Sequence, residues 1–423
     1  MEPTSENQER IVRLINKGAE IRNPLTIDIG EDVEIDRISG NGVRIYPGCR
    51  IYGRETVIAG GARLGREGPV TIEDCQIGPK VELKAGYFKQ AAFLEMANMG
   101  SGAHVREGCI LEEEANGAHC VGLKQTILFP FVTLGSLINF CDCFMAGGTS
   151  RKDHSEVGSS YIHFNFTPSG DKTTASLIGD VPRGVMLNQP PIFLGGQGGM
   201  VGPLRLNYGN VIAAGAILRK DVLECGKLII TKTHRAGLFP FVPDLYSGLP
   251  RILENNIRYL ANLAALEQWY IHVRQPFFQT QELGALIYQG AVDKLALAKK
   301  ERIKRLRVMT DKVEASLERH GDQADAGAGK RELCNAVEEI AELFSGELAE
   351  RSGLRARDGF LEAFTDHRKT YDGTYVETVQ SLPGGVPEKG TAWLQEIVDA
   401  VSRRAAALMP SLGLFKELTR EAR

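Results

Sequence analysis

A six-residue spacing of aliphatic side chains runs through the first half of the chain and limits the folds that it can adopt. From Asp28 onwards an aliphatic residue returns about every six positions, as at Ile45, Ile51 and Val57. Six residues turn an α-helix by about 600°, or about 1.67 turns, so this spacing builds no apolar stripe on a helix. Glycines directly after several of these positions also break the alternation of an ordinary strand.

Short strands joined by tight turns around a triangular core account for this spacing. In such a parallel β-helix the recurrent aliphatic side chain points inward, and glycine supplies the positive φ that a sharp corner requires. The chain has 47 glycines, which are concentrated in its first 250 residues. At about 18 residues a coil, residues 25–232 would hold roughly ten coils once a loop insertion near 146–176 is subtracted. A glycine-rich β-sandwich is the alternative, which the sustained period disfavours.

The second half of the chain has the composition and spacing of helices. Beyond Pro250 glycine becomes rare, and Ile252, Ile257 and Leu260 begin a stripe with helical spacing. We therefore expect a separate α-helical C-terminal domain over residues 250–423, packed beside the β-helix as an oligomerisation or lid domain. Its predicted parts are a helix over 280–318, a linker near 320–330, and shorter helices over 331–350 and 391–407. Residues 1–24 are predicted to form an N-terminal helix and lead-in.

Composition excludes several classes of partner and location. A net charge of −3 gives no overall field toward nucleic acid or anionic lipid, so we expect no nucleic acid and no membrane as partner. No apolar run approaches the roughly 20 residues that span a bilayer, and the polar stretch Met1–Arg13 lacks the apolar core of a secretory signal. Eight cysteines without paired spacing suit a reducing cytosol, so the predicted location is cytoplasmic. Cys141 and Cys143 have no second ligand pair nearby, and no metal is predicted.

Four segments resemble motifs of a known family. Val121–Thr126 is similar to a Val-Glu-Val-Lys-x-Ser/Thr turn, and Ala146–Thr149 to a Gly-Ala-Gly-Thr turn. Asn165–Lys172 resembles an Asn-Tyr-Asp-Gly loop with a trailing lysine, and Ile212–Val222 an Ile-Ala-Ala-Gly…Thr-Arg-Asp-Val terminus. Together they resemble the hexapeptide-repeat acyltransferases, which fold as a left-handed parallel β-helix. Within that family, residues 25–225 are most similar to the C-terminal acetyltransferase half of the bifunctional UDP-N-acetylglucosamine pyrophosphorylase/glucosamine-1-phosphate acetyltransferase.

The resemblance implies an activity, a co-substrate and an assembly. It suggests an acyltransferase, in the usual form of the family an acetyltransferase, that uses acetyl-CoA or another acyl-CoA and acts on a sugar phosphate or nucleotide sugar. Family members are homotrimers with sites between neighbouring subunits, and we expect the same here. The family's catalytic histidine turn falls on Pro130–Gly135, where Phe131 and its neighbours include no histidine. A non-catalytic nucleotide-sugar-binding or scaffold β-helix is therefore the alternative, and with residues 1–24 before the repeats we expect no nucleotidyltransferase domain.

The insertion supplies the candidate catalytic residues, because residues 150–165 concentrate titratable side chains where the six-residue period is lost. Acyl transfer needs a base for the attacking group and a donor for the oxyanion, and histidine titrates near neutral pH. His163 and Asn165 are two residues apart, so on an extended segment they share one face as a predicted base and substrate-orienting residue. His154 is the second candidate base. Alternatively, both histidines only bond the loop to a neighbouring coil.

Basic and small residues around the insertion are candidate ligand contacts. The cations that could receive a phosphate or nucleotide diphosphate are Lys124, Lys172, Arg151 and Lys152. The first two match positions where the family holds its sugar-phosphate ligands. The resemblance further implies that acyl-CoA contacts Gly195, Gly196, Ala213, Ala214 and Arg219 or Lys220. The alternatives are that the cations are solvated surface charges and that the glycines only turn corners.

Overall fold

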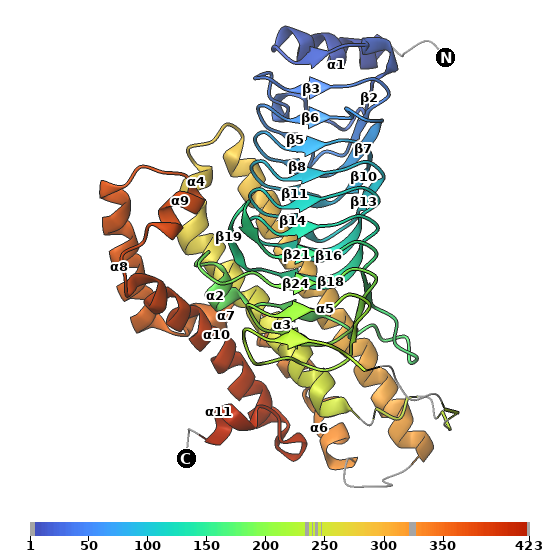
Figure 1. The fold of residues 1–423 in the computed structure, drawn as a ribbon, viewed down its shortest axis with the longest axis vertical. Coiled ribbons are helices and arrows are strands. Elements are labelled where there is room, and N and C mark those ends of the chain that lie inside the picture. Colours follow the sequence, from blue (N-terminus) through green and yellow to red (C-terminus); the bar gives the residue numbers. More distant parts are fainter. Residues whose placement is uncertain are drawn as a thin grey trace.

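The computed structural model describes residues 5–232, 237–238, 240–241, 244–246, 248–320 and 327–420. An N-terminal helix, α1 (Ser5–Asn16), covers the first coil of a long stack of strands (Figure 1), and its Ile11 and Leu14 are buried. Just after the helix, the Lys17 ammonium donates to the carbonyls of Ile35 and Ile38 at 2.9 and 2.6 Å. The helix therefore closes the end of an apolar core that would otherwise meet water.

From Glu20 to Ile229 the chain winds into a parallel β-helix, which confirms the predicted fold of the first half. One face is an 11-stranded sheet, and its strands come from successive coils. In order along the stack they are β1 (Glu20–Ile21), β3 (Arg44–Ile45), β6 (Arg63–Leu64), β9 (Glu82–Leu83), β12 (Asn98–Met99), β15 (Asn116–Gly117), β17 (Thr133–Leu134), β21 (Glu156–Val157), β24 (Phe193–Leu194), β27 (Val211–Ile212) and β29 (Leu228–Ile229).

The other two faces share a 16-stranded sheet, because two long strands turn the corner between them. The second face is made of β2 (Asp28–Ile29), β4 (Arg50–Tyr52), β7 (Val70–Glu73), β10 (Gly86–Lys89), β13 (Ala103–Val105), the first halves of β16 (Gly122–Leu128) and β18 (Asn139–Met145), β22 (Ile162–Phe164), β25 (Gly199–Val201) and β28 (Ile217–Leu218). The third face is made of β5 (Val57–Ile58), β8 (Gln76–Ile77), β11 (Ala91–Phe93), β14 (Cys109–Leu111), the second halves of the two long strands, β23 (Ser176–Ile178) and β26 (Arg205–Leu206). The insertion adds an antiparallel ribbon, β19 (Gly148–Ser150) with β20 (Asp153–His154). A short helix, α2 (Val181–Gly184), follows β23.

Side chains stack in columns inside the coils, at positions that the six-residue spacing predicts. On the 11-stranded face the buried partners in register are Ile45, Leu64, Leu83, Met99, Gly117, Leu134, Val157, Leu194 and Ile212. Gly117 takes an aliphatic position because the Met99 side chain fills its space: a Cβ there would lie 2.7 Å from the Met99 sulfur. Stacking of like on like gives each coil a core that it could not bury alone.

The corner between the second and third faces repeats one backbone conformation from coil to coil. Gly53 and Gly108 hold positive φ there, of 91° and 75°, as expected of glycine. Other residues hold the same left-handed conformation at the equivalent corners, with φ of 47–60°, at Asp74, Gln90, Gln125 and Asp142. Glycine is therefore one way to turn this corner and not a requirement for it.

Two helices of the second half lie along the third face (Figure 1). α5 (Gly284–His320) contacts β8, β11 and β14, and α3 (Leu249–Trp269) contacts β23, so that coils and helices share one continuous apolar core. α10 (Val386–Leu408) packs on α3 and on α8 (Leu354–Thr370). The remaining described elements of this region are a π-helical turn (Tyr270–Arg274), α4 (Gln275–Phe278), α6 (Gly327–Glu342), α7 (Glu347–Arg351), α9 (Tyr375–Gln380), a 3-10 turn (Pro410–Leu412) and α11 (Lys416–Arg420).

The predicted linker near 320–330 falls mainly on residues 321–326, which lie outside the described residues. On either side of them, α5 ends at His320 and α6 begins at Gly327. Across the part of the chain that the structure describes, no helix has the length and apolar character needed to cross a membrane.

Candidate functional site

An open groove lies on the outer side of the second face, over β13, β16 and β18. It has a volume of about 460 Å³, and its wall includes His104, Arg106, Asn139, Cys141 and Ile162. In register, Gly122 pairs with His104 on one side and with Asn139 on the other. A Cβ at Gly122 would have an open space around it, with Asn139 Oδ1 at 3.9 Å, so the missing side chain leaves room between the histidine and the amide. Both of those side chains are exposed.

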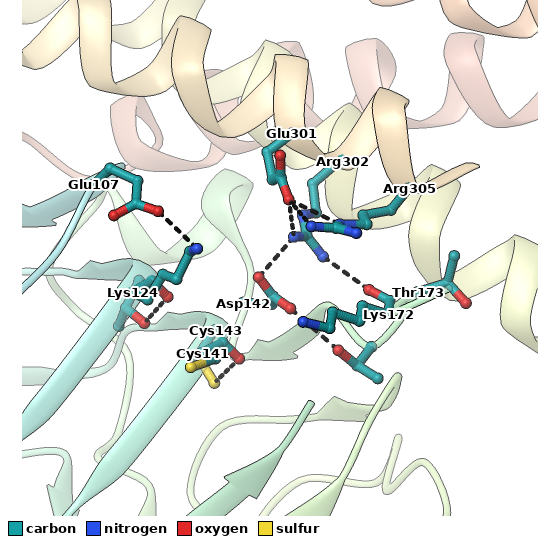
Figure 2. Close-up of polar contacts among 12 residues, drawn as sticks. Glu107, Lys124, Cys141, Asp142, Cys143, Lys172, Thr173, Glu301, Arg302 and Arg305 are labelled. Carbon is teal, nitrogen blue, oxygen red and sulfur yellow. Dashed lines mark hydrogen bonds and ion pairs between the residues drawn. The ribbon is translucent and has the colours of Figure 1, made fainter. Parts of the chain in front are cut away.

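Lys124 of β16 lies beside this groove and is engaged by a carboxylate. Its ammonium is 2.6 Å from Glu107 Oε1 (Figure 2), and about a third of each side chain is exposed, 28% and 31%. Burial alone would raise the pKa of Glu107, but the hydrogen bond from Lys124 and its positive charge lower that pKa below its usual value. A ligand phosphate at Lys124 would therefore have to displace Glu107.

Lys172 is held through its backbone by the helical region. The Arg302 guanidinium, on α5, donates to the Lys172 carbonyl at 3.3 Å and pairs with Asp142 Oδ1 at 2.7 Å (Figure 2). Only 3% and 5% of the Arg302 and Asp142 side chains are exposed. Burial raises the pKa of Asp142 although the charge of Arg302 opposes the rise. The Lys172 side chain is exposed, so α5 fixes the end of the Asn165–Lys172 loop and leaves its ammonium free to move.

The predicted base, His163, lies inside the β-helix. It is 2% exposed, and its Nε2 is 2.8 Å from Ser176 Oγ of the neighbouring strand β23. Burial lowers the pKa of His163 to about 4, so its imidazole is neutral at pH 7. Asn165 follows the end of β22 and is half-buried in the loop. Substrate would reach Nε2 of His163 only after displacement of the Ser176 hydroxyl.

The other predicted side chains of the insertion differ in how far their polar atoms are already bonded within the protein. His154 is half-buried on β20, with Nδ1 3.0 Å from the Arg151 carbonyl and Nε2 3.8 Å from Glu156. Arg151 donates through one nitrogen to the carbonyls of Glu114 and Phe131 and to the Thr133 hydroxyl, at 2.9–3.1 Å. Its guanidinium thus joins the insertion to two earlier coils. The Lys152 side chain is exposed.

The predicted acyl-CoA positions lie at the last coils. Gly195 and Gly196 are packed between coils, because a Cβ on them would lie 2.4 Å from the Ala214 nitrogen and 2.7 Å from the Ser159 carbonyl oxygen. Coil packing alone therefore accounts for both glycines. Ala213 is half-buried, whereas the side chains that reach solvent are those of Ala214, Arg219 and Lys220.

The groove residues His104, Arg106 and Asn139 were not predicted from the sequence. Each stands alone in its coil, so no motif marks it, and only the strand register brings them together. Phe131, at the turn where the resembling family has its histidine, is 3% exposed with φ of 71°, which places it at a packed inner corner. Among the described residues there is no group of three or more His, Cys, Asp or Glu side chains that could hold a metal ion.

No protein-family model matches the chain, but curated relatives match half of it. Bifunctional protein GlmU of Thermotoga maritima is 26% identical over 217 residues, which are 50% of this chain and 42% of that protein. Bifunctional protein GlmU of Pelobacter propionicus is 27% identical over 228 residues, which are 53% of this chain and 45% of that protein. The resemblance to the hexapeptide-repeat family is confirmed.

This chain spans less than half the length of the curated relatives that it matches. A solved structure, LpxA from Acinetobacter baumannii, aligns with 66% of this chain and 95% of its own at 12% identity. The TM-score of that alignment is 0.21, which is too low to bear on the fold. The parallel pairing of strands in successive coils establishes the β-helix instead.

Proposed function

We propose that this chain is an acyl-CoA-dependent transferase of the hexapeptide-repeat type, with a sugar phosphate or nucleotide sugar as acceptor. The similarity of half the chain to bifunctional GlmU proteins supports this class of reaction. The observation that carries the acceptor site is the open groove on the second face, whose wall includes an exposed histidine and Arg106.

In the proposed reaction an acceptor hydroxyl or amine attacks the thioester carbonyl carbon of acyl-CoA. A new C–O or C–N bond forms and the C–S bond breaks. A base takes the acceptor's proton and passes it to the departing CoA thiolate, so that CoA leaves as the thiol. His104 is exposed in the groove and can fill that role. Arg106 and Lys124 would hold the acceptor's phosphate. Two strand spacings of about 4.8 Å separate His104 from Asn139, which leaves roughly 10 Å for a sugar between them.

His163 is the competing base within this proposal. Its burial, its low pKa and the Ser176 hydroxyl at its Nε2 favour His104 as the base in the folded chain. His154 is a weaker competitor, because it lies on β20 and does not line the groove.

Donor, assembly and location belong to the same proposal. Acetyl-CoA or another acyl-CoA would lie along the last coils, where Arg219 and Lys220 are exposed and can meet its phosphates. The protein would act as a homotrimer in the cytoplasm, with a neighbouring copy against the second face. Exposed apolar side chains on that face, Leu137, Ile162 and Phe164, support such a contact.

A non-catalytic nucleotide-sugar-binding or scaffold protein is the second candidate. It is favoured by the absence of histidine from Pro130–Gly135 and by the structural use of Arg151, one nitrogen of which donates to two earlier coils. In this case the groove would bind the sugar ligand without transfer.

Release of CoA thiol tests the proposal. The full chain is incubated with acetyl-CoA and a panel of amino- and hydroxy-sugar phosphates and nucleotide sugars. We expect thiol release with at least one acceptor, and a loss of about 10²–10⁴-fold in kcat for His104→Gln, the range for removal of a general base. His119→Gln, an exposed histidine bonded to Ser136 at 2.7 Å, is the matched control.

Two outcomes count against the proposal. Loss of activity in His163→Gln with full activity in His104→Gln would move the base to the buried histidine. No thiol release with any acceptor, together with saturable nucleotide-sugar binding, would replace the enzyme with the binding protein.

A further inference from the structure

A second cavity is lined by residues of the last coils and of α2, α3 and α10. Figure 1 shows these helices beside the last coils. The volume of this cavity is about 180 Å³, and three arginines from three elements line it: Arg183 of α2, Arg205 of β26 and Arg258 of α3. Pockets for drug-sized ligands hold about 300–1,000 Å³, so this one suits a smaller group. It belongs to the covered third face and not to the groove on the second face.

The arginines are unequally neutralised. Arg183 donates through Nε to Asp180 Oδ2 at 2.8 Å, and its second nitrogen contacts Asp180 and Asn207. Asp180 is the carboxylate that lines the cavity, and it is already paired with Arg183. Arg183 also lies over the Tyr208 ring, with its central carbon 4.8 Å from the ring centroid. This arginine is therefore locked in place by neighbours on three sides.

Arg205 and Arg258 pair with carboxylates that do not line the cavity. Arg205 reaches Asp221 Oδ2 at 3.5 Å, and Arg258 contacts Glu417, whose side chain is 61% exposed. The Nε atoms of both arginines are buried and have no hydrogen-bond partner among the described residues. Burial lowers the pKa of Arg258 below its usual value, and the positive charge of Arg205 lowers it further. The two guanidiniums thus line one cavity, and the carboxylate that lines it, Asp180, is already paired with Arg183.

We propose that this cavity binds a phosphate group between Arg205 and Arg258, with Arg183 as a third cation in its wall. A phosphate dianion can accept hydrogen bonds from both guanidiniums at once, including from Nε atoms that have no other partner among the described residues. Guanidinium binds phosphate oxygens through paired hydrogen bonds, which supplies geometry as well as charge. The ligand is inorganic phosphate or the phosphate of a small phosphomonoester. Its binding would hold the last coils to the helical region, because the two arginines belong to β26 and α3.

Calorimetric titration of the full chain with inorganic phosphate, at constant ionic strength in chloride, tests this site. We expect saturable binding of one phosphate per chain, competition by sulfate and none by chloride. Arg205→Gln and Arg258→Gln should each weaken binding by about tenfold or more, since each removes charged hydrogen bonds to the anion. Arg50→Gln, an exposed arginine on β4 at the far end of the stack, should bind as the wild type does.

Glu417→Gln is a control for misfolding, because it should strengthen phosphate binding, which a misfolded variant could not do. It removes the carboxylate that competes for Arg258, so phosphate should bind more tightly to this variant than to the wild type. A phosphomonoester that binds at least as tightly as inorganic phosphate identifies an organic ligand, and weaker binding identifies the free ion. No saturable phosphate binding, or equal affinities in the Arg205, Arg258 and Arg50 variants, overturns the proposal. Thiol release by the groove is a separate measurement, so either proposal can fail without the other.

Discussion

The stability of the folded protein should fall in mild acid, because the unfolded chain binds a proton at His163 that the folded chain does not. The unfolded chain binds this proton with a pKa of 6.5, whereas burial lowers the folded pKa to about 4. The folded state therefore binds fewer protons between these values, so its stability is fully present above pH 6.5 and falls as the pH drops toward 4. At about pH 5, some 1.5 units below the unfolded value at about 1.4 kcal/mol each, the loss is about 2 kcal/mol relative to about pH 7.5.

Urea unfolding at these two pH values measures the effect in the wild type and in His163→Gln. Glutamine does not titrate, so the variant should lose about 2 kcal/mol less than the wild type when the pH falls. His104→Gln removes an exposed histidine and should follow the wild type at both pH values. Equal losses in the wild type and His163→Gln would refute the reasoning, because they would mean that the imidazole can take a proton inside the coil.

Two further predictions concern buried charges at the junction of coils and helices. Burial raises the pKa of Glu112, which accepts a hydrogen bond from the Tyr270 hydroxyl at 2.5 Å, to about 7, so its folded form keeps a proton that the unfolded chain releases. Stability is then lost as the pH rises from 4.5 through 7, and Glu112→Gln should raise the free energy of unfolding at about pH 8 by up to about 3 kcal/mol, as measured by urea unfolding, with little change at about pH 4.5. Arg302→Met leaves the carboxylate of Asp142 buried and unpaired, and should lower the free energy of unfolding by about 3–5 kcal/mol. Adding Asp142→Leu should recover much of that loss; a double variant as unstable as the single one would contradict the assignment.

The coils could be predicted from the sequence because their order is local. Each inward side chain stacks on its counterpart one coil away. The sequence therefore repeats the same apolar position in successive coils. Packing of the helical region beside the β-helix was predicted, but the face that it covers was not, although a signal for it exists. In β5 both Val57 and Ile58 are buried, the second inside the coil and the first against Phe278 and Ile287 of the helical region. A strand that is apolar on both sides indicates a packed layer on each side. The six-residue period marks only the side that faces the inside of the coil.

The site was harder to predict for a related reason. The polar density of the insertion indicates chemistry, yet much of that polarity serves the fold: Arg151 bonds two earlier coils, and His163 bonds Ser176. The groove gathers His104 and Asn139 from different coils, so they are distant in sequence and inconspicuous within their own segments. Pairing through Gly122 separates them by steps of 18 and 17 residues, about one coil each. In a β-helix the neighbours of an outward residue are found one coil away, so a search for sites has to compare positions at the coil period and not along a contiguous motif.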